Sequence, residues 1–77
     1  MKIIAENEKW ILKEKPRVAG GRRRFYFMDK STGKFWVIWM NNISLRCRFS
    51  VEMERDPDAL NWVLDHLMNL EYLENEV

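Results

Sequence analysis

The chain has 77 residues, of which 47% are hydrophobic and 32% charged, and its formal net charge is +1. This length accommodates one small domain, residues 1–77, and excludes a second hydrophobic core, while the apolar content with four tryptophans excludes a disordered chain. One cysteine excludes an internal disulfide, and no apolar run approaches the roughly 20 residues of a membrane-spanning helix. We therefore expect a cytoplasmic protein that does not bind membranes.

The small net charge conceals a division along the chain. Residues 1–49 hold twelve Lys or Arg and four Asp or Glu, whereas residues 50–77 hold one Arg and eight Asp or Glu. Such an asymmetry is compatible with an acidic partner for the basic part, and nucleic acid is one candidate. It is equally compatible with two oppositely charged surfaces that are merely solvated.

Residues 1–15 form the first strand region of the predicted fold. Residues 9–13 are predicted to be a short strand, although residues 5–15 are also rich in helix formers and the first element could be a helix. The strand ends before Pro16, because proline removes a backbone donor. Residues 16–22 follow as a mobile basic loop that contains two adjacent glycines.

A β-meander is predicted over residues 23–55, and its first hairpin is centred on residues 29–34. We expect a four-residue loop, residues 30–33, with Gly33 in the left-handed region and Asp29 capping the turn. This loop predicts two pairs on the core face: Phe27 with Trp36, and Phe25 with Ile38. A three-residue loop with a bulge would exchange the two faces.

The second hairpin is predicted at Asn41-Asn42, because asparagine tolerates positive φ and suits a two-residue turn. The segment before it, Phe35–Met40, is apolar throughout, and residues 43–54 alternate apolar with polar side chains, the period of a half-buried strand. The turn predicts three pairs on the core face: Met40 with Ile43, Ile38 with Leu45, and Trp36 with Cys47. A slip by one residue would bury Arg46 and Arg48, which is excluded energetically.

The last element is a helix over residues 56–74, with Asp56 as N-cap and Pro57 at the first helical position. An apolar stripe at helical spacing is expected to cover the dry face of the sheet; it comprises Ala59, Leu60, Val63, Leu64, Leu67 and Leu70. Trp62 and Leu73 lie on its flank, where they could pack against the first strand or remain exposed. The predicted fold is α+β, a single four-stranded antiparallel sheet with one C-terminal helix packed across one face, in the order β-β-β-β-α.

Catalytic chemistry is nearly absent from the sequence. His66 is the only histidine and has no second metal ligand nearby, and Cys47 falls on the predicted core face. Gly20-Gly21 lacks the spacing of a phosphate-binding fingerprint and is expected to be a flexible loop. We therefore expect a protein that is not an enzyme, with no catalytic residues, no cofactor and no metal.

The predicted outer face of the sheet carries aromatic and aliphatic side chains beside arginines. Soluble monomers rarely expose a contiguous apolar patch of this kind, so the face is the candidate binding site. Its candidate residues are Arg22, Arg23, Arg24, Tyr26, Phe35, Val37, Trp39, Arg46 and Arg48, with Met28 beside them.

Three interpretations of this face compete. The first is a protein partner, because aromatic residues, Met and Arg are enriched at interface cores. The face would be either a homodimer seam or a surface that docks on a larger host enzyme or complex, as a small inhibitor or adaptor does. The acidic helix would then offer a second surface, a possible nucleic-acid mimic, through Asp65, Glu71, Glu74 and Glu76.

The alternative function is binding of single-stranded DNA or RNA on the same face, with bases stacked on the aromatic rings and phosphates held by the arginines. The ribonucleoprotein signature is absent, because the run Arg23-Arg24-Phe25-Tyr26-Phe27 lacks its glycines. In a third interpretation the patch is a second small core, covered by Trp10, Ile11, Leu12 and Val18.

Overall fold

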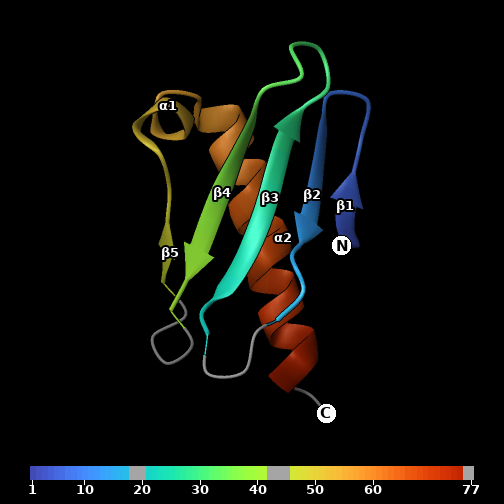
Figure 1. The fold of residues 1–77 in the computed structure, drawn as a ribbon, viewed down its shortest axis with the longest axis vertical. Coiled ribbons are helices and arrows are strands. Elements are labelled where there is room, and N and C mark those ends of the chain that lie inside the picture. Colours follow the sequence, from blue (N-terminus) through green and yellow to red (C-terminus); the bar gives the residue numbers. More distant parts are fainter. Residues whose placement is uncertain (18–20, 42–45, 76–77) are drawn as a thin grey trace.

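The computed structural model describes residues 1–17, 21–41 and 46–75, the last six by their backbone alone. The described strands form one antiparallel sheet of five strands in the order β1-β2-β3-β4-β5, and helix α2 lies behind it in Figure 1. The predicted α+β class is confirmed, with one strand more than expected. The elements are β1 (Lys2–Glu6), β2 (Trp10–Glu14), β3 (Arg23–Asp29), β4 (Phe35–Met40), β5 (Cys47–Arg48), α1 (Val51–Glu54) and α2 (Pro57–Asn75).

The additional strand, β1, lies within the first strand region and pairs with β2. Asn7 organises the turn between them, because its Oδ1 accepts the backbone N–H groups of Lys9 at 2.8 Å and Trp10 at 2.7 Å. Such side-chain turns favour a reversal of the chain over a helix. The alternative of a helix over residues 5–15 is therefore wrong. A bulge between Ile3 and Ala5 interrupts the ladder at this edge of the sheet.

The first predicted hairpin is confirmed in loop length and register. Phe27 pairs with Trp36 and Phe25 with Ile38, and Gly33 has φ of 73°. Asp29 caps the turn, since its Oδ1 accepts the backbone N–H of Ser31 at 2.9 Å and the hydroxyl of Ser31 at 2.6 Å. These two bonds hold the pKa of Asp29 below its usual range.

The second hairpin differs from the prediction. Met40 pairs with Cys47 rather than Ile43, and the backbone N–H of Asn41 donates to the carbonyl of Arg46 at 2.9 Å, so the connection is longer than two residues. A two-residue type I′ turn needs positive φ at both positions, which Asn-Gly provides better than Asn-Asn. The predicted partners Ile43 and Leu45 lie outside the described residues, and the predicted pair of Trp36 with Cys47 is wrong.

The predicted strand over residues 43–54 is also too long, because β5 ends at Arg48 and helix α1 follows. Ser50 is the N-cap of α1, and its side chain accepts the backbone N–H of Met53 at 3.3 Å. Met53 is buried as expected, but Val51 is 62% exposed. Phe49 lies before α1 and Met53 within it, and both contact the core.

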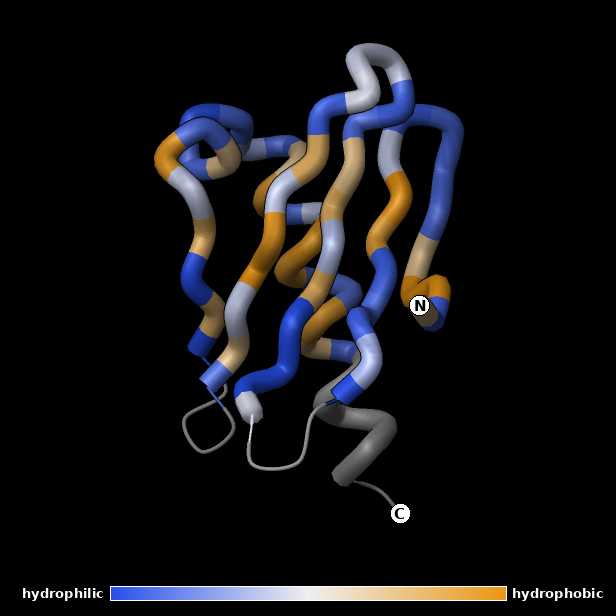
Figure 2. The backbone as a smooth tube through the Cα atoms, viewed as in Figure 1, coloured by the Kyte–Doolittle hydropathy of each residue, from blue (hydrophilic) through white to orange (hydrophobic). Residues whose placement is uncertain are grey.

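The core lies between the sheet and α2, as the sequence predicts. Figure 2 shows hydrophobic segments concentrated in the central strands and in the part of α2 behind them, whereas the turns at one end of the sheet are hydrophilic. Its fully buried side chains include Leu12, Phe25, Phe27, Ile38, Met40 and Val63.

The N-terminus of α2 is confirmed: Asp56 caps it, because its Oδ1 accepts the N–H of Ala59 at 3.3 Å. On the flank, Trp62 packs against Trp10 of β2 with ring centroids 5.5 Å apart, one of the two positions that the sequence leaves open. The side chains of Leu70 and Leu73 are outside the described part of the chain. Among the described residues, no helix has the length and apolarity to span a membrane.

Candidate binding surface on the open sheet face

The face of the sheet opposite α2 is uncovered by any described helix or strand (Figure 1). The first strand region adds two strands to the sheet rather than folding over it, and Leu12 belongs to the core, with Trp10 packed against it. The third interpretation, a second small core, is therefore wrong for Trp10 and Leu12, whereas Ile11 is buried on the outer face beside Met28 as part of the sheet itself, and Val18 lies outside the described residues. We call this surface the outer face; its side chains, by strand register, include Ile11, Lys13, Lys15, Arg24, Tyr26, Met28, Phe35, Val37, Trp39 and Arg48.

One half of the outer face is apolar. Met28 pairs with Phe35, and Tyr26 pairs with Val37, so these four side chains are neighbours on β3 and β4. We call them the apolar ridge. Phe35 is 54% exposed, and Ile11 of β2, which pairs with Met28, is 8% exposed. On the β2 side the ridge borders the buried side chain of Ile11. On the β4 side the Phe35 side chain is exposed to solvent.

Two rings of the apolar ridge stack on each other. The centroids of Tyr26 and Phe35 are 4.6 Å apart and their planes differ by 16°. Two rings stacked at this distance cover one face of each other, and Phe35, at 54% exposed, is the more open of the two. Lys15, which follows β2, places its Nζ 6.0 Å from the Tyr26 centroid. Tyr26 therefore has Phe35 against one face and a cation over the other.

The other half of the outer face is cationic. The strand register places Arg24 and Arg48 directly opposite Trp39, one on each neighbouring strand. Lys15 continues this row, because its backbone N–H donates to the carbonyl of Arg24 at 2.9 Å. The guanidinium of Arg24 also donates to the Pro16 carbonyl at 3.2 Å, which ties it to the segment after β2.

Trp39 is 43% exposed and stands beside a shallow hollow at the end of the sheet. The residues that line this hollow are Arg22, Trp39, Asn41, Arg46, Cys47 and Arg48. We call these residues, together with Arg24, the Trp39 corner. Of the seven, four are arginines and none is acidic. The structure therefore brings together four of the five arginines that the sequence proposes for binding.

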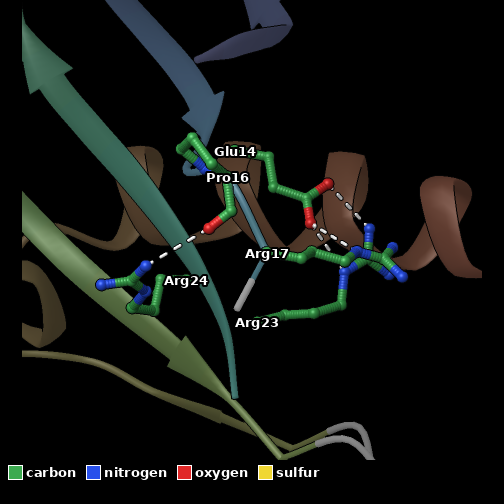
Figure 3. A network of polar contacts seen from close by, with 5 residues as sticks. All are labelled: Glu14, Pro16, Arg17, Arg23 and Arg24. Carbon is green, nitrogen blue, oxygen red and sulfur yellow. Dashed lines mark hydrogen bonds and ion pairs between the residues drawn. The ribbon is translucent and has the colours of Figure 1, made fainter. Parts of the chain in front are cut away.

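Arg23 is the exception, and its placement corrects the sequence-based list. Phe25 is in the core, so strand alternation directs Arg23 to the same face, away from Arg24. Figure 3 shows the result: Arg23 and Arg17 converge on Glu14, whereas Arg24 points to Pro16. Both Glu14 and Arg23 are buried. The hydrogen bonds from Arg23, more than its charge, hold the pKa of Glu14 below its usual range.

Lys13 and Lys15 belong to the outer face but were missing from the sequence-based list. The signal was present, because Leu12 is an obvious core residue and its neighbours along a strand must alternate. Of the proposed acidic surface, Asp65 is exposed on α2, on the opposite side of the sheet from the ridge. The side chains of Glu71 and Glu74, and all of Glu76, lie outside the described part of the chain.

The remaining chemical groups are occupied by structural roles. His66 packs on the Trp62 ring with centroids 4.7 Å apart, and its Nδ1 donates to the Trp62 carbonyl at 2.8 Å. Cys47 packs partly buried against the core, on the face that the sequence predicts. Within the described ranges, no three His, Cys, Asp or Glu side chains come together as a metal site.

Comparison of the chain with protein-family models, with curated proteins and with solved structures finds no match.

Proposed function

We propose that the protein is a non-enzymatic binding module whose apolar ridge docks on a different protein. The observation that supports this proposal is the stack of Tyr26 on Phe35, 4.6 Å between centroids, with Lys15 over the other side of Tyr26. Nucleic-acid bases stack on the faces of aromatic rings. With both faces of Tyr26 covered, Phe35 is the one ring of the ridge left with an open face, and it lies beside Met28 and Val37, an arrangement that suits an apolar protein surface better than a run of stacked bases.

The ridge also has the energetic character of an interface centre. Aromatic side chains on a rigid sheet lose little conformational entropy on binding, since their positions are already fixed by their neighbours. The stack fixes Tyr26 and Phe35 against each other, and Val37 fills the row beside Tyr26. Apolar area at the centre with cations at the rim is the usual anatomy of a docking surface.

The charges of the outer face favour a partner of another kind over a second copy. The side chains that border the ridge are cationic: Lys13, Lys15, Arg24 and Arg48. A carboxylate on the same face, Glu6 beside Ile11, is paired with Lys30. A two-fold interface through this face would set these cations against their own copies. The partner we propose is a protein with an apolar surface rimmed by carboxylates, for which the module acts as an inhibitor or adaptor.

The test is affinity capture from the native host, treated with nuclease, using the parent and two matched variants. Phe35→Ala removes an aromatic side chain from the ridge, whereas Met68→Ala removes an apolar side chain of similar exposure, 65%, from α2. We expect a partner that is retained by the parent and by Met68→Ala and lost with Phe35→Ala. Equal recovery of the partner with both variants would show that the ridge is not the docking surface.

Sedimentation equilibrium tests the choice of partner. The isolated chain is expected to sediment as a monomer of 9.4 kDa, because its outer face repels a second copy. A dimer that dissociates on the Phe35→Ala substitution would show that the ridge is a homodimer seam.

A further inference from the structure

We infer that the Trp39 corner binds single-stranded nucleic acid, with one base on the Trp39 ring and backbone phosphates on the arginines around it. This inference is separate from protein docking on the apolar ridge: it rests on Trp39 and the cations around it, of which Lys15, Arg24 and Arg48 also border the ridge. Trp39 differs from Tyr26, whose ring has Phe35 on one face and Lys15 over the other and so has no open face for a base. Among the described residues, no ring contact or cation over the ring is found for Trp39.

The register sets the spacing of the corner. Arg24 and Arg48 lie on the strands either side of Trp39, and neighbouring strands are about 4.8 Å apart. Each arginine therefore begins one strand spacing from the indole, on opposite sides. A base stacked on Trp39 would have its two flanking phosphates within reach of two guanidinium groups, without any rearrangement of the sheet.

The loops at the end of the sheet extend this arrangement. Arg22 precedes β3 and Arg46 precedes β5, and both line the hollow beside Trp39. Lys15 lies at the far end of the same row, beyond Arg24. Cations therefore lie on both sides of Trp39, where they would meet the phosphates on the 5′ and 3′ sides of a base stacked on the indole.

The chemistry of the corner favours phosphate over carboxylate. The planar fork of arginine binds phosphate bidentately, and an indole has a face that any base can stack on. The carboxylates of an acidic peptide would pair with the arginines but would not themselves stack on the Trp39 ring. Stacking on an indole and pairing with phosphate do not depend on the identity of the base, so the expected binding tolerates different sequences.

The direct test uses a fluorescein-labelled ten-nucleotide oligothymidylate, and fluorescence anisotropy measures its affinity for the full chain at several salt concentrations. We expect the logarithm of the association constant to fall linearly with the logarithm of the salt concentration, because bound phosphates release counterions. Trp39→Leu is expected to weaken binding about 5- to 150-fold, the range measured for loss of one stacked base. Arg48→Gln is expected to weaken binding and to lower the salt slope by about 0.7, the value for one phosphate contact on a single strand.

Two controls keep the result specific. Lys34→Gln removes an exposed cation beside the first hairpin, outside the corner, and is expected to leave the affinity unchanged. Circular dichroism establishes that each variant is folded, which is expected because Arg48 and Lys34 are exposed.

Three outcomes would overturn the inference. One is the absence of oligothymidylate binding at low salt. Another is an equal loss of affinity with Lys34→Gln and Arg48→Gln, which would indicate nonspecific attraction to a basic surface. A third is tighter binding of a ten-residue polyglutamate peptide than of the oligonucleotide, which would assign the corner to an acidic protein segment.

Discussion

The guanidinium of Arg23 donates two hydrogen bonds to the carboxylate of Glu14, from Nε to Oε2 at 2.9 Å and from Nη2 to Oε1 at 2.8 Å. The pair joins the end of β2 to the start of β3, and Arg17 adds a third, longer contact at 3.3 Å. Two-pronged pairing of this kind is among the stronger polar contacts in proteins. Its position at the base of the loop between β2 and β3 fixes where both strands leave the sheet.

Replacing Glu14 by glutamine is expected to reduce the free energy of unfolding by about 1–3 kcal/mol at neutral pH, because a buried guanidinium loses its carboxylate. The folded-state pKa of Glu14 lies below its unfolded value of about 4.3. The pair therefore contributes stability above that unfolded value and loses it as the pH falls through the folded one.

Urea denaturation between pH 7 and pH 3 measures this linkage. The parent is expected to lose more stability across the range than Glu14→Gln, which retains the acid dependence of Asp29. Glu8→Gln removes an exposed carboxylate and serves as the control. Parallel stability curves for the parent and Glu14→Gln would show that the pair does not govern acid unfolding.

Gly33 provides a test of backbone conformation without steric conflict. Its φ of 73° disfavours L-residues, yet an added Cβ would meet no atom within 4 Å. Gly33→Ala is therefore expected to destabilise the fold by about 1–2 kcal/mol through the left-handed backbone alone. Gly33→Asn should cost less, since asparagine tolerates this region. Urea denaturation of the two variants would contradict the assignment if asparagine were the more damaging.

Much of the fold follows from strand alternation, because the face assigned to each strand residue stays correct even where the predicted turn is wrong. The observed pairing of β4 with β5 is shifted by four residues from the predicted one, because Met40 meets Cys47 instead of Ile43. A shift by an even number keeps every side chain on its face. Cys47 thus remains on the core side and Arg48 on the outer face, although the connection between the strands is longer than predicted.

The errors have a common physical origin. Alternation of apolar and polar residues describes one strand face but does not show where the strand ends: Ser50 caps a helix in which Met53 is buried and Val51, on the same face by alternation, is exposed. Arg23 could have been assigned to the core face by parity with Phe25. Its carboxylate partner, Glu14, could not be identified, because the pair depends on the register between β2 and β3 across an intervening loop.

Phe27 and Phe49 are expected to differ in importance to the core. Phe27 is 1% exposed and its ring meets Trp10, Trp36 and Trp62 at centroid distances of 6.3, 5.9 and 6.2 Å. Phe27→Ala should cost about 3–5 kcal/mol, enough to threaten a domain of this size. Phe49 only flanks the core, so Phe49→Ala should cost less, about 1–3 kcal/mol.

Thermal denaturation followed by circular dichroism ranks these variants. Phe27→Leu is the milder substitution if Phe27→Ala does not fold, and it should still lower the melting temperature. Equal destabilisation by Phe27→Ala and Phe49→Ala would mean that Phe49 is as deeply buried as a residue of the central strands.

Val51 distinguishes the helix that the structure shows from the strand that the alternating pattern predicts. It occupies the first position of α1, where a backbone N–H has no helical partner and proline is favoured. Ser50 before it has φ of −71° and ψ of 157°, the extended conformation that a following proline requires. Val51→Pro is therefore expected to be neutral or to stabilise the fold by up to about 1 kcal/mol. Within a paired strand the same change would remove a ladder hydrogen bond and destabilise the domain.

Glu54→Pro is the matched control for this substitution. Glu54 is also exposed, but its backbone N–H donates to the Ser50 carbonyl at 3.1 Å. Proline at this position loses that bond and clashes with the same carbonyl, at a cost of about 3 kcal/mol in a longer helix. Urea denaturation of the two proline variants is expected to separate them clearly. Strong destabilisation by Val51→Pro would restore the extended strand over residues 43–54, because only a ladder partner would make that N–H necessary.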